Sequence, residues 1–367
     1  MRVESIHPKN LSVSDVAAWR SFLRADPELS SPYLTPDWAR LVAVHRSDVR
    51  VAVFRTEAGE PLGFLPVQRC GDFAAMPAGG PICDYQALAA KPGVTLDLAM
   101  APKALSVGRI DLTAGLMNNA VGHRLLTSDA GHVVRFVGGY EAWCAERLAA
   151  GTKTIAKTRK KLAKMTRDLG DAVTFDAFST DPHAFETLMT WKREQMKRTG
   201  VRDIFEHAWI DGVVRGTFAA PGDDHCFGGA MFVLRVKGAP AAVLFCLRAD
   251  KALHAWYVAH DNQWAQYSPG LIVFVEAIRA AAEAGYTELD LGPGEYQFKE
   301  SLANASRACG AGLIAGQGLS PALKAAQFQV RAMVESLPVG RVRQWPAKAM
   351  RRLDIARGLA APAGRVA

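Results

Sequence analysis

The sequence predicts an α/β (α+β) protein with two tandem domains, each a mixed, mostly antiparallel sheet flanked by helices, followed by a basic helical tail. Three observations carry this prediction. The chain has 367 residues, more than one ordinary hydrophobic core accommodates. Strand-like and helix-like patterns alternate in a similar order in both halves. The stretch 255–302 reads as strand, loop, helix, strand, Gly-rich turn and short helix.

We expect a first domain at residues 1–150, a second at 151–318 and the tail at 319–367. The tail is expected either to pack on the body or to be partly disordered. A hydrophobic share of 49% with 22% charged residues is typical of a globular protein.

The sequence also indicates a compartment. The six cysteines are scattered without a CxxC pair, which favours reduced thiols and no metal site. The N-terminus lacks the apolar core of a signal peptide, and no apolar run is long enough to span a bilayer. We therefore expect a cytoplasmic protein, with peripheral contact at the inner membrane face as an open alternative.

The first half predicts a strand (2–6), two helices (14–25 and 35–45) and a hairpin of two strands (49–55 and 62–68). A Gly/Pro loop (76–85), two strands (106–111 and 133–137) and a closing helix (140–150) follow. Val16, Trp19 and Leu23 share one face of the first helix. Pro36 is a favoured first residue for the second helix.

The second half opens with a basic helix at 151–170. A strand, a helix and two strands joined by a turn follow, at 173–178, 181–199, 227–236 and 241–248. The next helix spans roughly 269–284, about 24 Å at 1.5 Å per residue. Ser268 is a favoured N-cap, Pro269 a favoured first residue, and Gly285 a favoured stop. Because its free N–H groups and positive dipole end follow a strand, this helix predicts a phosphate-bearing donor.

Positive charge is concentrated in two segments. Residues 319–367 hold nine Lys/Arg against two Asp/Glu, and residues 151–170 hold seven against one. Lys160, Lys161 and Lys164 suit either an anionic acceptor or a solvated interdomain helix. The tail cations suit an anionic membrane surface, an acidic nucleotide or packing on the first domain; they are Arg341, Arg343, Lys348, Arg351 and Arg352. No motif predicts specific DNA binding.

Four segments resemble a known family. They are WKREQMKRTG at 191–200, AWYVAHD at 255–261, YSPGLIVFVEAI at 267–278 and TELDLGPGEYQFK at 287–299. They are similar to the CelD/BcsL-type acetyltransferases of the GNAT superfamily, which are associated with cellulose and other exopolysaccharide synthesis. The resemblance covers about residues 150–300 well and the first half loosely. The FemAB-type peptidyltransferases, which use aminoacyl-tRNA and share a tandem GNAT-like fold, have the same pattern, including the pair Phe298-Lys299.

The resemblance implies an acyl-CoA-dependent N- or O-acyltransferase, with acetyl-CoA or another acyl-CoA as donor and no metal. The acceptor would be a sugar or sugar precursor, linked to a nucleotide or lipid, or a polysaccharide, and transfer would be direct in a ternary complex. GNAT enzymes usually carry a Q/R-x-x-G-x-G/A loop around the pyrophosphate, whereas residues 266–271 hold one Gly. Two alternatives stay open: a FemAB-like aminoacyl-tRNA-dependent transferase, and a non-catalytic GNAT-fold sensor of an acidic ligand or membrane.

Candidate site residues follow from this comparison. The catalytic candidates are His260 at a strand end and a polar cluster at the next Gly-rich turn, namely Asp290, Glu295, Tyr296 and Lys299. The donor-binding candidates are Tyr257, Val258, Ser268, Gly270 and Leu271. The substrate-binding candidates are Trp191, Lys192, Gln195 and Arg198 on one helix, with Asp84 and Tyr85 in the first half. Each also has a structural interpretation as a cap, a salt bridge or an ordinary helix face.

Overall fold

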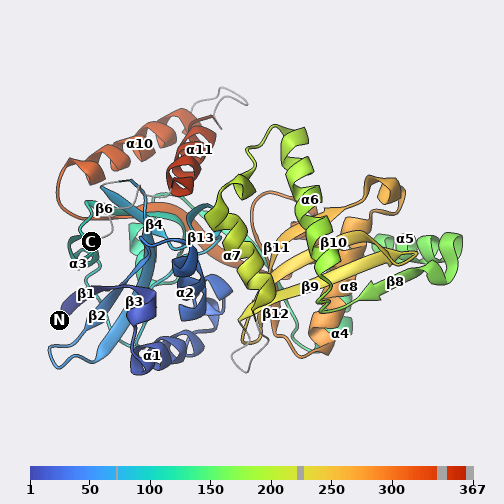
Figure 1. Ribbon diagram of the computed structural model, residues 1–367, viewed down its shortest axis with the longest axis horizontal. Helices are drawn as coiled ribbons and strands as arrows, with labels where there is room; N and C mark the ends of the chain where they lie inside the picture. The colour runs from blue at the N-terminus through green and yellow to red at the C-terminus, as the bar shows by residue number, and fades with distance from the viewer. Residues whose placement is uncertain (72, 221–226, 337–344, 361–367) are drawn as a thin grey trace. The chain divides into compact units, whose positions relative to one another are not determined.

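The computed structural model describes residues 1–71, 73–220, 227–336 and 345–360. The chain forms two compact units (Figure 1). Unit 1 consists of Met1–Asp129 and Ala308–Ala367, and unit 2 of Ala130–Arg307. The chain therefore passes from unit 1 to unit 2 between residues 129 and 130, and returns to unit 1 between residues 307 and 308. The division predicted from the sequence has its boundaries at 150 and 318. Helix α4 (Gly139–Ala149) belongs to unit 2 because it packs on helix α8 there.

Unit 1 is built on a mixed sheet with the strand order β1-β2-β3-β4-β6-β13, and β5 pairs with β3. Neighbouring strands are antiparallel except β4 and β6. The strands are β1 (Arg2–Ile6), β2 (Arg50–Arg55), β3 (Pro61–Arg69), β4 (Ala74–Pro77), β5 (Ala89–Ala90), β6 (Arg109–Leu116) and β13 (Ala305–Ala315). The expected hairpin is confirmed as β2 and β3.

Strand β13 is absent from the sequence-based assignment. Its sequence, ASRACGAGLIA, is rich in Ala and Gly, which have weak strand propensity. Steric crowding explains why glycine occupies two of these positions. A Cβ at Gly310 would lie 1.9 Å from the carbonyl oxygen of Thr127, and one at Gly312 would lie 2.0 Å from that of Arg124. The neighbouring backbone therefore approaches β13 too closely for any side chain at these positions.

The helices of unit 1 are α1 (Val13–Arg24), α2 (Pro36–His45), α3 (Met100–Ala104), α10 (Leu319–Ser336) and α11 (Trp345–Leu359). The Ser12 side chain accepts from the Asp15 N–H and caps α1, and the Thr35 side chain caps α2 in the same way. The C-terminal helices pack on this unit: Arg46 donates to the Gly358 carbonyl at 3.1 Å. The last residues of the tail, 361–367, lie outside the described residues, so the expectation that the tail is partly disordered stays a prediction.

Unit 2 is built on a sheet with the strand order β7-β12-β11-β10-β9-β8. Only the β11–β12 pair is parallel among these described neighbours. The strands are β7 (Asp129–Arg135), β8 (Val173–Asp176), β9 (Gly228–Val236), β10 (Ala239–Ala249), β11 (Ala252–His260) and β12 (Glu288–Pro293). Each unit thus has the mixed, mostly antiparallel sheet that the sequence predicts.

Helices cover both faces of the unit 2 sheet. They are α4, α5 (Thr154–Leu169), α6 (Pro182–Thr199), α7 (Ala208–Ala219), α8 (Pro269–Glu283) and α9 (Gln297–Leu302). Figure 1 shows α6 and α7, in green, across one face and α8, in orange, behind the strands. Side chains alternate along β10. Leu244 belongs to the core that contains α8, whereas Phe245 packs edge-on against Phe185 of α6, with ring centroids 5.4 Å apart.

Among the described residues, no helix combines the length and apolar composition needed to cross a membrane.

A buried ionic cluster within unit 2 joins β11 and β12 to Arg307, the last residue of that unit. Arg307 donates to Asp290 at 2.5 Å and to Glu288 at 2.8 Å, and His254 Nδ1 lies 3.7 Å from the Asp290 carboxylate. All four side chains are buried. Charges removed from water are stable only when they are paired. The cluster therefore fixes these strand segments to one another.

We expect Arg307→Ala to lower the free energy of unfolding by about 3–5 kcal/mol, because two buried carboxylates lose their cation. Urea denaturation followed by tryptophan fluorescence measures this loss. Arg279→Ala is the matched control, since it breaks a partly exposed pair with Glu276 on α8. That control is expected to cost about 0–1 kcal/mol. Equal losses in the two variants would contradict a stabilising role for the buried cluster.

Candidate functional site

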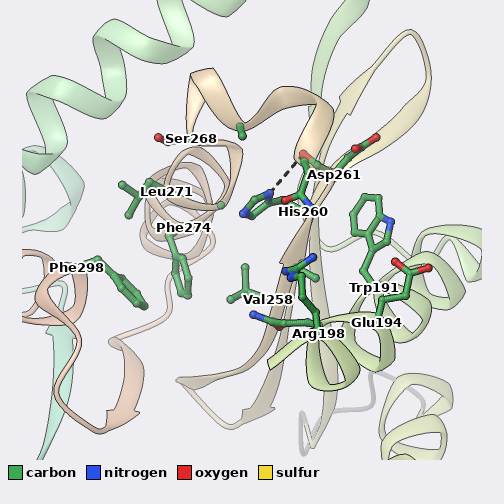
Figure 2. Close-up of a pocket in the computed structure, with 15 residues that line it drawn as sticks. Trp191, Glu194, Arg198, Val258, His260, Asp261, Ser268, Leu271, Phe274 and Phe298 are labelled. Carbon is green, nitrogen blue, oxygen red and sulfur yellow. Dashed lines mark hydrogen bonds between the residues drawn. The ribbon is translucent and has the colours of Figure 1, made fainter. Parts of the chain in front are cut away.

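A pocket of about 590 Å³ lies in unit 2. It is lined by one face of α6, the end of β11, the short helix η8 (Asn262–Tyr267), the first turns of α8, and Phe298 of α9. The pocket has two chemically different sides (Figure 2). Leu271, Phe274 and Phe298 form an apolar side, and α6 presents polar side chains opposite. The arrangement suits a ligand with an apolar part and a polar part.

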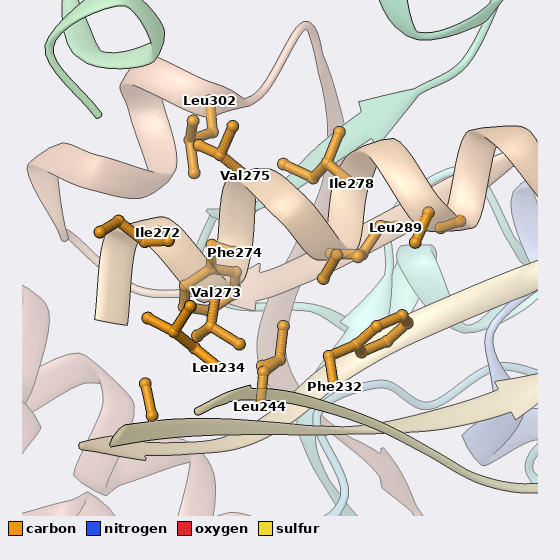
Figure 3. Packing of buried hydrophobic residues seen from close by; sticks show 14 of the residues in the cluster. Phe232, Leu234, Leu244, Ile272, Val273, Phe274, Val275, Ile278, Leu289 and Leu302 are labelled. Carbon is orange, nitrogen blue, oxygen red and sulfur yellow. The ribbon is translucent and has the colours of Figure 1, made fainter. Parts of the chain in front are cut away.

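Helix α8 is held rigidly at the base of the pocket. Its residues Ile272, Val273, Val275 and Ile278 are buried in the core of unit 2. Figure 3 shows this helix above Leu234 and Leu244 of the sheet, with Leu302 of α9 beside Val275 on its other side. A run that is apolar on all faces is typical of a buried helix. The N-terminus of α8 is thereby fixed in the pocket wall.

The first turn of α8 differs from the expected cap. Ser268 has a left-handed backbone (φ 55°) and its side chain makes no capping hydrogen bond in the described structure. The prediction that Ser268 caps the helix through its side chain is therefore wrong. Instead the Ser268 carbonyl accepts the N–H groups of Leu271 and Ile272, at 3.0 and 3.2 Å. Pro269 has no N–H. Gly270 N–H has no acceptor within the described residues.

A lysine stands at the same helix end. Lys161 of α5 donates to the Ser268 hydroxyl. Lys164, one turn later, lies 5.8 Å from the centroid of the Tyr267 ring, whose hydroxyl donates to Asp168 at 2.9 Å. The positive dipole end, the free N–H of Gly270 and an ammonium group bonded to Ser268 thus belong to the same end of α8. This combination favours an anion.

Strand β11 offers a free edge beside the pocket. Its pairing with β12 ends at His254↔Asp290, whereas its pairing with β10 continues to His260↔Ala242. The Asp261 N–H donates to the Ala241 carbonyl at 3.0 Å. Because antiparallel pairing alternates, the N–H groups of Val258 and His260 point away from β10, toward the side that β12 has left. These N–H groups are suitable donors to a carbonyl oxygen.

His260 and Asp261 border the pocket, but they do not form a pair through their side chains. The His260 ring is exposed, and its Nδ1 lies 3.4 Å from the backbone oxygen of Asp261. The Asp261 carboxylate instead accepts the Gln263 N–H at 2.8 Å and caps η8. The His260 ring lies over the helix end, because a Cβ on Gly270 would be 3.2 Å from His260 Cδ2.

Helix α6 contributes the polar side of the pocket. Trp191, Gln195 and Arg198 line it, together with Glu194, which the sequence analysis missed. The spacing i, i+3, i+4, i+7 places all four on one face, so that periodicity was the available signal for Glu194. Lys192 lies outside the lining, with its Nζ 5.9 Å from the Tyr257 ring centroid. Burial lowers the pKa of Lys192.

The polar cluster after β12 is not brought into the pocket. Asp290 is buried against Arg307, and its carboxylate also accepts the Gly292 N–H at 2.7 Å. Glu295 and Tyr296 are exposed and do not line the pocket. Lys299 donates to the Pro293 carbonyl at 2.9 Å. These four side chains hold or flank the Gly-rich turn. From this segment, Phe298 lines the pocket, 5.3 Å from Phe274 between ring centroids.

The remaining candidates divide between the units. Val258, Ser268, Gly270 and Leu271 line the pocket. Tyr257 is buried, with its ring 5.3 Å edge-on from that of Phe205. Asp84 and Tyr85 belong to unit 1, where Tyr85 is buried. The tail cations Arg341 and Arg343 lie outside the described residues, as do the side chains of Lys348 and Arg351.

Comparison with known proteins identifies the domain that contains the pocket. The family description "Acetyltransferase (GNAT) domain" matches residues 153–300, which include every pocket-lining residue. None of the curated proteins compared with the chain matches it. The resemblance to the GNAT superfamily is therefore confirmed for this segment. The CelD/BcsL assignment stays a prediction.

Solved structures share the fold of most of the chain. FemX has 11% sequence identity and a TM-score of 0.54, with 89% of this chain and 99% of that chain covered. The C-terminal DUF2156 domain of a protein assigned as a lysylphosphatidylglycerol synthetase from Agrobacterium fabrum has 14% identity and a TM-score of 0.52, with 86% and 96% covered. A tandem GNAT protein of the clavulanic acid pathway has 9% identity and a TM-score of 0.47, with 86% and 99% covered. The predicted α/β fold of tandem GNAT-like domains is confirmed.

Lys161→Ala is expected to weaken binding of inorganic pyrophosphate about tenfold or more, since one charge-assisted hydrogen bond contributes about 1.5–3 kcal/mol. Isothermal titration calorimetry measures this affinity. Lys160→Ala is the control, because Lys160 is an exposed neighbour on the same helix and its loss changes the net charge equally. Identical affinities for the two variants would remove Lys161 from the anion site.

Proposed function

We propose, from the premise that residues 153–300 form a GNAT acetyltransferase domain, that the protein transfers a small acyl group from acyl-CoA to an amine or hydroxyl group of a sugar. One observation supports this most directly. Gly270, with its free N–H, and the open edge of β11 line a single pocket, and the Lys161 ammonium donates to Ser268, which also lines it. An acyl-CoA carries the two groups that such a pocket suits: phosphates and a thioester carbonyl.

The donor would be oriented by both features. Its pyrophosphate would lie at the N-terminus of α8, beside Gly270 and Lys161. Its thioester carbonyl would accept a hydrogen bond from the N–H group of Val258 or of His260. This donor stabilises the negative charge that develops on the oxygen when the carbonyl carbon becomes tetrahedral. No covalent enzyme intermediate is required, because the acceptor attacks the thioester carbon directly.

The transfer needs a proton acceptor for the attacking amine or hydroxyl group. His260 is suited to this role, because its imidazole lines the pocket next to the strand edge. The acceptor N–C or O–C bond forms as the thioester C–S bond breaks, and the proton passes through His260 to the thiolate sulfur. Asp290 lies in the buried ionic cluster and does not take part in this proposal.

The acceptor would bind along α6. The Trp191 indole provides a flat apolar face, on which a sugar ring can stack. Glu194, Gln195 and Arg198 offer hydrogen-bonding groups around it, and Arg198 suits a phosphate on a nucleotide- or lipid-linked sugar. A role in exopolysaccharide synthesis, including cellulose, rests on the family resemblance of these segments.

A second candidate is aminoacyl transfer from tRNA. The observation that favours it is the small number of backbone donors at α8: the Leu271 and Ile272 N–H groups are taken by the Ser268 carbonyl. A diphosphate therefore finds one free N–H there, at Gly270. The shared fold with FemX is compatible with this candidate. An aminoacyl ester would use the same strand edge for its carbonyl.

Gly270→Leu is expected to weaken acetyl-CoA binding about tenfold or more, because the new side chain covers the free N–H and displaces His260. Calorimetric titration with acetyl-CoA, CoA and a longer acyl-CoA measures the effect. Glu283→Leu, which places the same side chain in the last turn of α8, is the control. If the wild-type protein binds no CoA species, the acyl-CoA proposal fails and charged tRNA becomes the donor to test.

Trp191→Ala is expected to raise the KM for a sugar acceptor about tenfold with a smaller change in kcat, because ring stacking is lost in the ground state and transition state alike. Trp191→Phe keeps an aromatic face and should restore most of the affinity. Acetyl transfer to amino-sugar acceptors, followed as thiol release, provides both constants. An unchanged KM in Trp191→Ala would place the acceptor away from α6.

A further inference from the structure

Helix α10 carries an exposed apolar row. Its members are Leu319, Leu323, Val330 and Met333, with exposed fractions of 81, 67, 60 and 68%. Steps of four, seven and three residues keep them on one side of the helix. The row extends over about 21 Å at 1.5 Å per residue. We call these four residues the α10 row.

The opposite side of α10 is fixed to unit 1. Pro321, Lys324 and Phe328 are buried there. Lys324 forms an ion pair with Asp354 of α11 at 2.7 Å, and Arg109 of β6 donates to Ser320. The helix therefore does not need the α10 row for its own packing. The row faces outward from a helix that is already anchored.

Charged residues on α10 lie away from the row. Its charged side chains are Lys324, Arg331 and Glu335. Lys324 pairs with Asp354, and Arg331 pairs with Glu335 at 2.7 Å. Four large apolar residues in line, with no charge among them, differ from the scattered exposed hydrophobic residues that are normal on a protein surface. Such a row indicates a surface that another phase or molecule covers.

We propose that the α10 row inserts into the surface of an anionic lipid bilayer. The net positive charge of the C-terminal segment favours an anionic membrane as the surface that covers the row. Residues 319–367 hold nine Lys/Arg against two Asp/Glu, and Arg352 of α11 is exposed. A second copy of the chain would bring two strongly basic segments together, whereas an anionic headgroup layer is complementary to them. An apolar helix side together with basic residues supplies the two signals that stable interfacial binding requires.

The helix would lie parallel to the membrane plane. Its apolar side would enter the boundary between headgroups and acyl chains, and the net positive charge of residues 319–367 favours an anionic headgroup layer there. The inference does not depend on acyl transfer, because it uses only the exposed row of α10 and the charge of residues 319–367. A lipid-linked acceptor, where the enzyme uses one, would then be encountered at the same surface.

Vesicle co-sedimentation of the full chain tests the proposal. We expect the wild-type protein to sediment with vesicles of phosphatidylcholine containing about 30% phosphatidylglycerol, and to stay largely in solution with pure phosphatidylcholine. The double variant L323E/V330E should lose most of the binding to anionic vesicles, about tenfold or more in partition. Both positions are exposed, so the melting temperature should stay unchanged.

The matched control is V13E/V44E. Val13 and Val44 are exposed by 88 and 75% on other helices of unit 1, and the double substitution changes the net charge equally. This control should bind like wild type. A second variant, L323S/V330S, removes apolar area without changing charge and should also lose binding.

Three results would overturn the proposal. The first is wild-type protein that binds neither vesicle, or that loses no binding in L323E/V330E relative to V13E/V44E. The second is a wild-type dimer in analytical ultracentrifugation that L323E/V330E converts to monomer, which would assign the α10 row to self-association. Retention of binding in L323S/V330S would attribute lipid contact to the basic residues alone and would also contradict insertion.

Discussion

The buried ion pair between Arg307 and Asp290 lies at the residue where strands β11 and β12 separate. The same carboxylate accepts the Gly292 N–H and so begins the turn that carries β12 away. An uncompensated charge at this depth would be costly, so the pair and the point of separation are fixed together. The open strand edge beside the pocket depends on that separation. A residue that the sequence suggests as a catalyst thus has its clearest role in shaping the site.

The pocket combines a rigid wall with an adaptable one. Helix α8 is buried in the core of unit 2, so its first turn and the Gly270 N–H are held in place. Helix α6 instead presents Glu194, Gln195 and Arg198 as exposed side chains. In the proposed reaction, fixed donors are an advantage because reorganisation is avoided. If the acceptor binds along α6 as proposed, substitutions there would alter acceptor specificity more readily than the chemical step.

Predictions from the sequence were correct where the structure depends on interactions between residues close together in the chain. The start of α2 at Pro36 and the stop of α8 before Gly285 follow from backbone constraints within a few residues. Ser268 shows the limit, because the turn before α8 adopts a left-handed conformation and its hydroxyl contacts Lys161 instead. Strand β13 was missed for a related reason: its glycines serve close backbone approach, which has no local signature.

By itself the sequence determined the fold class, most helices and strands of both units, and the position of the helix end at which we propose that a phosphate binds. Hydrophobic periodicity and helix caps depend on residues within one or two turns of each other, so the local sequence is enough to predict them. Only the tertiary structure decided which polar residues share a pocket. Asp290 lies within β12 and His260 ends β11. Burial beside Arg307 keeps Asp290 out of the pocket, whereas His260 is exposed where β11 has lost its pairing with β12. Strand pairing and charge burial depend on partners distant in sequence, and for that reason no local pattern encodes them.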